Sequence, residues 1–231
     1  MTSEARKAAG LDKFYRRIGA HGWRDSRYFT FSVRSPALRH WLAAQLPARS
    51  AAVLSIGCGT GEVERHLSAS RHRVVGLDVS YQMLRSAARR GLERLVQGDA
   101  RSLPFAAASF DVVLFPESIG HLALADVLRE AKRVLKERGR LLITTYASAV
   151  GVHPRYRKFA PDDIAQALDD AGFRLEEQRF LTAKRNAVVE VPSDDGAELL
   201  YFSSRKTAAA RGAGSATKNR AGLLHGRAGG R

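Results

Sequence analysis

Residues 53–61, Val-Leu-Ser-Ile-Gly-Cys-Gly-Thr-Gly, decide the fold of this chain. Their mostly apolar beginning is typical of a strand that is buried on both faces of a parallel sheet. Gly57, Gly59 and Gly61 then allow a tight turn and a close approach of the backbone to a ligand. The run 62–67 can begin a helix whose free N–H groups point back at that ligand. This order predicts a cofactor site at the carboxyl edge of an open α/β sheet.

The glycine spacing excludes two common nucleotide sites. A dinucleotide fingerprint needs G-x-G-x-x-G, but the position of its third glycine is here Glu62, an acid near the expected pyrophosphate. A Walker loop is excluded because no Gly-Lys-Ser/Thr follows. An acid at the start of the helix suits a ligand without phosphates.

A second short apolar strand within residues 71–80 ends in Asp78. A carboxylate at such a strand end commonly accepts hydrogen bonds from the two hydroxyls of a ribose, so this position indicates nucleoside recognition. Ser80 can cap the following helix, which is expected to stop at Gly91. Further strands are predicted over 93–97 and 109–115.

Together these segments resemble the class I S-adenosylmethionine-dependent methyltransferases, in particular the small-molecule branch that includes the ubiquinone/menaquinone methyltransferases. The matching motifs are V-L-S-I-G-C-G-T-G at 53–61, V-V-G-L-D-V-S at 74–80, G-D-A-R-S-L-P-F at 98–105 and S-F-D-V-V-L-F at 109–115. The resemblance implies an α/β fold with a seven-stranded, doubly wound, mostly parallel sheet of the Rossmann-like kind, whose last strand is antiparallel. It also implies S-adenosyl-L-methionine as the cofactor.

The resemblance assigns the cofactor-binding residues. The methionine end of the cofactor would lie on the loop of Gly57, Gly59 and Gly61, and Asp78 would hold the ribose. The adenine would meet three further residues, namely Met83 against the ring, Asp99 at the amino group and Ala100 through a backbone donor. Phe115 would border the methyl group and the acceptor pocket. Simple core packing is an alternative for Met83 and Phe115, as helix capping is for Asp78 and loop ordering for Asp99.

Ser55 departs from the resembled family, which usually carries Asp or Glu two residues before the first glycine. That acid helps to place the methionine moiety. Either Glu62 or water therefore substitutes for it, or the affinity for the cofactor is reduced. The same departure gives some support to a non-enzymatic hypothesis, in which the chain is a cofactor-binding regulatory module.

His121 and Glu117, just past the strand 109–115, are the candidate catalytic residues on the acceptor side. A histidine there can act as a base at neutral pH, although a hydrogen-bonded structural role is an alternative for both. The sulfonium already makes the methyl group electrophilic, so the protein mainly supplies orientation and excludes water. In-line transfer to a small molecule is therefore the predicted function, without a metal ion.

The remainder of the core follows the same periodic patterns. A helix is predicted from Ala123 to Lys136 and ended by Gly139, followed by a strand over 140–146. Pro161 opens another helix, which Gly172 stops, and two final strands are expected over 173–181 and 197–203.

Three regions are predicted: an N-terminal helical lid or extension over 1–47, the methyltransferase domain over 48–204 and a disordered basic tail over 205–231. In the first region, helices are expected at 11–18 and 34–46. Tyr15, Trp23 and Tyr28 are candidate lid residues, with packing against the core as the alternative.

The net charge of +15 suggests nucleic-acid binding until the distribution of the charged residues along the chain is considered. Residues 205–231 hold seven basic residues and no acid, and residues 1–40 hold nine basic and three acidic residues, which leaves only +2 for residues 41–204. Nucleic acid is thus an unexpected partner, although an RNA or protein methyltransferase stays open as the alternative. Residues 115–118, Phe-Pro-Glu-Ser, differ from the Asn/Asp-Pro-Pro-Tyr/Phe of exocyclic-amine methylases. Without a secretory or membrane-spanning run, a cytoplasmic location is expected.

Overall fold

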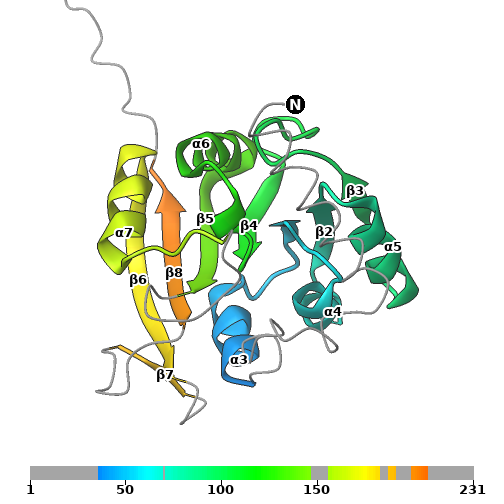
Figure 1. Ribbon diagram of the computed structural model, residues 1–231, viewed down its shortest axis with the longest axis horizontal. Coiled ribbons are helices and arrows are strands. Elements are labelled where there is room, and N and C mark those ends of the chain that lie inside the picture. The colour runs from blue at the N-terminus through cyan, green and yellow to red at the C-terminus, as the bar shows by residue number, and fades with distance from the viewer. Residues whose placement is uncertain (1–35, 70, 147–155, 183–186, 191–198, 208–231) are drawn as a thin grey trace, which may run out of the picture.

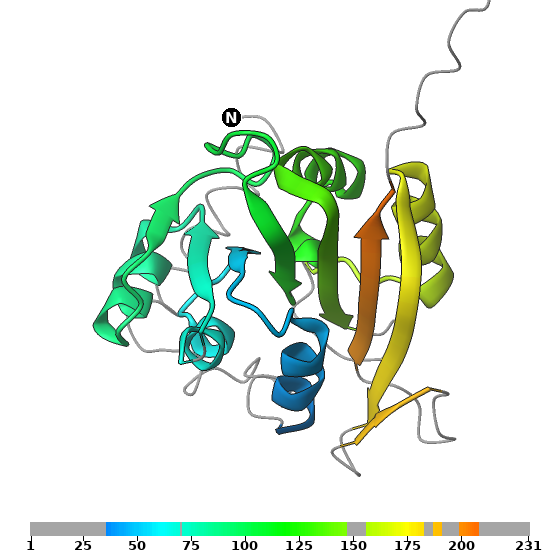
Figure 2. The ribbon, with the colours of Figure 1, turned by 180° about the vertical axis from the view of Figure 1, so that it is seen from behind.

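The computed structural model describes residues 36–69, 71–146, 156–182, 187–190 and 199–207. They build a mixed sheet flanked by helices (Figure 1), which the opposite view shows again (Figure 2). The strand order is β3-β2-β1-β4-β5-β8-β6-β7. This order confirms the predicted α/β fold with its doubly wound, mostly parallel sheet.

The parallel part of the sheet has its centre at β1. Its strands are β1 (Ala52–Ile56), β2 (Arg73–Asp78), β3 (Leu95–Gln97), β4 (Phe110–Pro116) and β5 (Leu135–Tyr146). The chain runs outward from β1 to β3 and then returns to the other side of β1 as β4. The order therefore reverses between β1 and β4, and such a switch point is where open α/β sheets bind ligands.

The last strands complete the sheet as expected, with one addition. Strand β8 (Leu199–Lys206) is antiparallel both to β5 and to β6 (Phe173–Thr182), which gives the predicted antiparallel last strand. The short β7 (Ala187–Val189) adds an eighth strand beside β6 that the sequence did not suggest.

Helices cover both faces of the sheet and bury two apolar cores. Helices α3 (Pro36–Gln45) and α4 (Glu62–Ser68) lie on one face, where Leu38, Trp41 and Leu67 join a core with Val53 and Val112. Helices α6 (Leu124–Val134) and α7 (Pro161–Asp170) cover the other face. Helix α5 (Tyr81–Arg89) packs beside β2 and β3.

The helix boundaries near the site follow the predicted signals. The Ser80 hydroxyl accepts the Met83 N–H at 3.4 Å, as an N-cap should. Gly91 and Gly172 follow α5 and α7 with φ of 89° and 74°, a region that favours glycine.

The connection between α6 and β5 corrects the sequence prediction. The helix ends at Val134, and β5 already begins at Leu135, which pairs with Phe110 before the register shifts. Gly139 is therefore part of an irregular strand rather than a helix stop. A Cβ at Gly139 would lie 2.8 Å from the Lys136 carbonyl oxygen, so this turn of the chain requires glycine.

The predicted outer regions are only partly described. Helix α3 lies inside the predicted extension 1–47 and contributes to the core, whereas Tyr15, Trp23, Tyr28 and the helix at 11–18 lie outside the described residues. Strand β8 continues to Lys206 through pairing with β6, so it extends two residues into the predicted tail 205–231. Within the described part of the chain, the longest helix has 11 residues, too short to cross a membrane.

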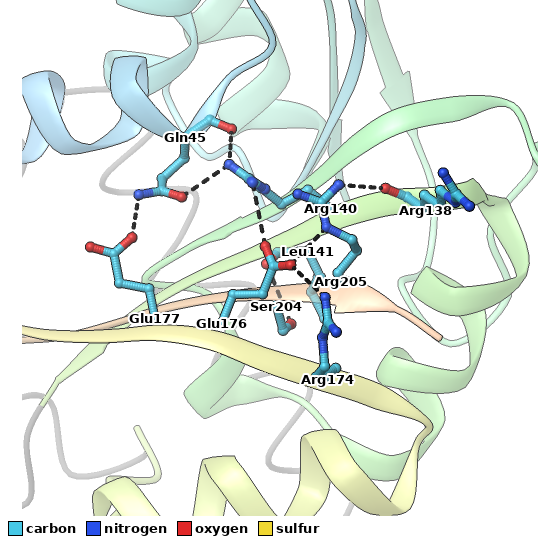
Figure 3. A network of polar contacts seen from close by, with 9 residues as sticks. All are labelled: Gln45, Arg138, Arg140, Leu141, Arg174, Glu176, Glu177, Ser204 and Arg205. Carbon is cyan, nitrogen blue, oxygen red and sulfur yellow. Dashed lines mark hydrogen bonds and ion pairs between the residues drawn. The ribbon is translucent and has the colours of Figure 1, made fainter. Parts of the chain in front are cut away.

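At the amino edge of the sheet, polar side chains join α3 to β5 and β6 (Figure 3). Arg140 donates to the Gln45 carbonyl oxygen at 2.7 Å and to its side-chain oxygen at 3.1 Å. Gln45 in turn donates to Glu177 of β6 at 2.5 Å. These bonds hold the helix against the antiparallel half of the sheet.

Glu176 is the centre of the same region. Its carboxylate pairs with Arg205 at 2.8 Å, Arg174 at 3.2 Å and Arg140 at 3.3 Å. The hydrogen bond from Arg205, helped by Arg174 and Arg140, lowers the pKa of Glu176 against the opposing effect of burial. We call Gln45, Arg140, Arg174, Glu176, Glu177 and Arg205 the amino-edge network.

Asp111 has the structural role that its place at the start of β4 predicts. It accepts the Ala52 N–H at 2.9 Å and pairs with Arg49 at 2.7 Å and Lys136 at 3.0 Å. Burial opposes ionisation, but these hydrogen bonds outweigh it and lower the pKa of Asp111 to about 2.

Candidate functional site

The loop after β1 takes a backbone course that only glycine adopts easily. Gly57, Gly59 and Gly61 have φ of 72°, 55° and 77°, in the left-handed region. A Cβ at Gly57 would lie 2.4 Å from the Ser118 Cβ, and one at Gly61 would lie 2.1 Å from a Leu92 methyl carbon. The three glycines are therefore required by the fold of the loop itself.

Asp78 holds this loop at the end of β2. One carboxylate oxygen accepts the Gly59 N–H at 2.8 Å, and the other accepts the Ser80 N–H at 2.8 Å. Burial raises the pKa of Asp78 against these two bonds. Because each carboxylate oxygen can accept a second hydrogen bond, the arrangement leaves capacity for the predicted ribose diol.

Ser55 meets a carboxylate that comes from the helix after the loop. Its hydroxyl donates to Oε1 of Glu64 at 2.5 Å, and both side chains are buried. Burial raises the pKa of Glu64 to about 7, although the bond from Ser55 opposes this shift. Sequence reasoning missed Glu64, since no spacing rule joins a strand residue to a helix residue nine positions later.

Glu62, which the sequence offered as a substitute acid, is engaged elsewhere. Its carboxylate pairs with Arg90 at 3.4 Å and lies 3.9 Å from Arg65. The acid beside Ser55 is therefore Glu64 rather than Glu62.

The segment after β3 places Asp99 and Ala100 at the same edge. Asp99 is partly exposed and receives the Arg101 guanidinium at 2.6 Å, and this bond lowers the pKa of Asp99. Ala100 is buried in the core. An adenine amino group would therefore share the Asp99 carboxylate with Arg101.

Met83 and Phe115 are both fully buried. Phe115 belongs to the core beneath α6 and α7, together with Ile56 and Ile119. Packing accounts for the burial of these two side chains without a ligand, and their roles toward the adenine and the methyl group remain predictions.

Glu117 and its neighbours join the end of β4 to the strands on either side. Glu117 has φ of 55°, and its N–H donates to the Thr144 carbonyl at 2.9 Å. Its carboxylate accepts the Tyr146 hydroxyl at 2.6 Å. The Ser118 hydroxyl donates to the Ile56 carbonyl at 2.6 Å, directly before the glycine loop.

His121 lies in a short 3-10 helix, Ile119–His121, and meets aromatic rings. Its ring stands edge-on to Tyr156 with centroids 4.9 Å apart, and Tyr156 stands edge-on to Tyr146 at 5.0 Å. The hydroxyls of Thr145 and Tyr156 share a hydrogen bond of 3.0 Å. We call Glu117, His121, Thr145, Tyr146 and Tyr156 the aromatic cluster.

The aromatic cluster brings the two candidate catalytic residues to one place. Burial, with a contribution from Glu117, raises the pKa of the Tyr156 phenol, so Tyr156 stays protonated at neutral pH. Sequence reasoning did not single out Thr145 and Tyr146, which lie at the end of β5. Their position at the carboxyl end of a parallel strand is the signal that could have found them.

The comparisons with known proteins agree over the central part of the chain. A family model described as a methyltransferase domain matches residues 54–143. The chain is 38% identical over 110 residues to a malonyl-(acyl-carrier protein) O-methyltransferase of Enterobacter lignolyticus. This alignment covers 46% of this chain and 44% of that protein. It is 41% identical over 97 residues to a demethylmenaquinone methyltransferase of Thermotoga maritima, with 39% and 42% covered. The alignments thus span less than half of either relative.

A solved structure extends the likeness beyond the matched segment. The Burkholderia thailandensis 1,6-didemethyltoxoflavin-N1-methyltransferase, with bound 1,6-didemethyltoxoflavin and S-adenosylhomocysteine, superposes with a TM-score of 0.69. The superposition covers 90% of this chain and 92% of that chain at 24% identity. The Rossmann-like methyltransferase fold is therefore confirmed for the described core.

Proposed function

Residues 54–143 form a methyltransferase domain of the class I S-adenosylmethionine-dependent kind, and from this premise we propose that the protein methylates a small molecule. One observation carries the proposal. At the carboxyl edge of the sheet, the loop 57–61 and Asp78 lie next to the aromatic cluster, and the hydrogen bond from Ser118 to Ile56 joins the two regions.

The residues at this edge fit S-adenosylmethionine. Asp78 has acceptor capacity for the ribose, and the left-handed backbone at Gly59 leaves no Cβ in the way of the ligand. Glu64 Oε2 and Thr60 Oγ1 are buried without a hydrogen-bond partner among the described residues. Polar atoms buried in this way are expected where a ligand completes the bonding.

When bound, the sulfonium supplies an electrophilic methyl group. The chain's own residues then need to orient the acceptor and exclude water, which the packed rings of Tyr146 and Tyr156 suit. Glu117 and His121 are the candidate proton acceptors for an acceptor that must lose a proton. Glu117 already receives a proton donor, the Tyr146 hydroxyl, so its carboxylate is held in a fixed orientation.

A small-molecule acceptor is supported by charge and by the relatives. Residues 41–204 carry a net charge of only +2, which provides little attraction for a phosphate backbone. The relatives' names mention a malonyl group carried on acyl-carrier protein and the small molecule demethylmenaquinone, and neither name mentions nucleic acid. We therefore favour a small organic acceptor over RNA or protein.

Calorimetric titration with S-adenosylhomocysteine tests the cofactor part of the proposal. We expect wild-type protein to bind, and we expect Asp78→Ala to weaken binding by about a hundredfold, since the ribose loses a charged acceptor. Folded protein that fails to bind would refute the proposal.

Methyl transfer from labelled S-adenosylmethionine then tests the acceptor class. Small carboxylic acids, quinols and heterocyclic amines are offered beside bulk RNA and protein. Product in a small-molecule pool, lost in Glu117→Gln or His121→Ala, would support the proposed roles. Product in RNA or protein alone would favour the alternative, and binding without product in any pool would favour a regulatory module.

A further inference from the structure

Glu64 is the most unusual ionisable group in the described residues. Its residue surface is 1% exposed, and only one of its two carboxylate oxygens has a hydrogen-bond partner, the Ser55 hydroxyl. Oε2 has none among the described residues. A buried carboxylate oxygen without a partner is costly, and it therefore calls for an explanation.

The surroundings of Glu64 disfavour the ionised form of its carboxyl group. Asp78 and Glu62 both act on Glu64 as like charges, whereas Cys58 within the loop is a thiol that burial keeps neutral by raising its pKa. The opposing donors are neutral, namely the Ser55 hydroxyl and the backbone of Glu64 itself. Asp78 and Glu62 therefore add negative charge near Glu64, and a cation is the ligand that would relieve it.

The position of Glu64 relative to the loop selects the cation. Glu64 lies in the first turn of α4, three residues after Gly61, and its carboxylate reaches back to Ser55, two residues before Gly57. It thus lies against both ends of the loop 57–61. If the proposed function holds, the ligand carried by this loop has one ammonium group, at its amino-acid end.

We propose that Glu64 is the positioning residue for the ammonium group of the cofactor, and that it supplies from helix α4 the carboxylate that Ser55 cannot supply from strand β1. This inference rests on the proposed function. Ser55 keeps a part in it, because its hydroxyl fixes one carboxylate oxygen and leaves Oε2 for the ligand.

A proton balance follows from this assignment. With a pKa of about 7, Glu64 is about half protonated at pH 7 before the ligand binds. An ammonium beside Oε2 favours the carboxylate, so binding releases about half a proton at pH 7 and becomes tighter as the pH rises from 6 to 8. A ligand that lacks the ammonium should cause no such release.

Two probes separate the amino-acid end from the rest of the cofactor. S-adenosylhomocysteine has the ammonium, whereas 5′-methylthioadenosine keeps the adenosine and the sulfur but has no amino-acid end. In Glu64→Gln we expect the affinity for S-adenosylhomocysteine to fall by about 30-fold or more, with the affinity for 5′-methylthioadenosine nearly unchanged. Glu62→Gln, the same change two residues away on a carboxylate paired with Arg90, is the matched control and should behave as wild type toward both.

Proton release provides a second measurement that needs no variant. Calorimetry of wild-type protein at pH 7 in buffers of different ionisation enthalpy should report released protons with S-adenosylhomocysteine and none with 5′-methylthioadenosine. Equal weakening of both ligands in Glu64→Gln, no weakening of either, or no proton release would overturn the inference alone. Failure of both ligands to bind wild-type protein would overturn the proposed function, and this inference with it.

Discussion

Glu64 and Glu176 carry the same carboxyl group but lie at opposite edges of the sheet. Glu176 is surrounded by Arg140, Arg174 and Arg205, and its pKa is lowered. Glu64 is buried beside a single serine hydroxyl, and its pKa is raised to about 7. The first carboxylate is satisfied by neighbouring side chains, whereas Oε2 of the second has no hydrogen-bond partner among the described residues.

The comparison extends to the two edges as a whole. The amino-edge network joins α3, β5, β6 and β8 by charged hydrogen bonds that are complete within the chain. At the carboxyl edge, the backbone is held in left-handed turns, and Glu64 and Thr60 keep buried polar atoms without partners in the described part of the chain. The amino edge is thus held by completed polar contacts, whereas these two polar atoms at the carboxyl edge have none within the described ranges.

The largest expected effect is a loss of folding stability when the glycine backbone at the carboxyl edge is changed. Gly57→Ala should lower the free energy of unfolding by about 3–5 kcal/mol, because a left-handed alanine is strained and its Cβ would collide with Ser118. Gly91→Ala, with φ of 89° but nothing within 4 Å of the added Cβ, should cost only about 1–2 kcal/mol. Denaturant unfolding measures both, and equal losses would show that contact with Ser118 adds nothing.

The next effect concerns the stability of the ligand-free protein at different pH values. The folded pKa of Glu64, about 7, lies above its usual value of 4.5, so folding loses stability as the pH rises from 4.5 through 7. Glu64→Gln removes that loss and should stabilise the protein by about 2–3 kcal/mol at pH 8. At pH 3, where Glu64 is protonated in both the folded and the unfolded state, the variant should match wild type. A destabilised variant at pH 8 would contradict the unsatisfied state of Glu64.

A smaller effect is expected from the amino-edge network. Arg140→Met keeps the apolar stem but removes the bonds to Gln45 and Glu176 and should cost about 1–2 kcal/mol. The affinity for S-adenosylhomocysteine should stay within about twofold of wild type, since the site lies at the other edge. A large loss of affinity with unchanged stability would reverse the assignment of the two edges.

The smallest expected effect is the loss of the contribution of Glu176 to folding stability at low pH. Its pKa lies below the usual value of 4.5, so its contribution is present above that pH and is lost as the pH falls through the lowered folded pKa. Glu176→Gln should therefore destabilise the protein at pH 7 by about 1 kcal/mol or less, and not at pH 2. The pH dependence of thermal unfolding should change in the opposite direction from that of Glu64→Gln.

Most of the site edge could be predicted because its signals are local in the sequence. The three glycines, Asp78 and Ser80 each follow a strand directly, and the parallel sheet brings such strand ends to one edge. Glu117 was found by the same rule. The structure gives Asp78 a use that the sequence did not suggest, as the acceptor that holds Gly59 in its turn.

The remainder depended on tertiary contacts that no local pattern records. Glu64 resembles any acid in the first turn of a helix, and only the approach of α4 to β1 places it at Ser55. The early start of β5 depends on pairing of Leu135 with Phe110, which outweighed the helical periodicity and the glycine at 139. Strand β7 is three residues long and carries no periodic signal of its own.

The contact between Gly57 and Ser118 has a consequence for redesign of this scaffold. The segment after β4 borders the acceptor in the proposed function, yet its Ser118 also packs against Gly57 of the loop 57–61. A grafted segment that carries a larger residue at 118 would push the loop 57–61 away from its course. Libraries at this position should therefore be restricted to serine and residues no larger.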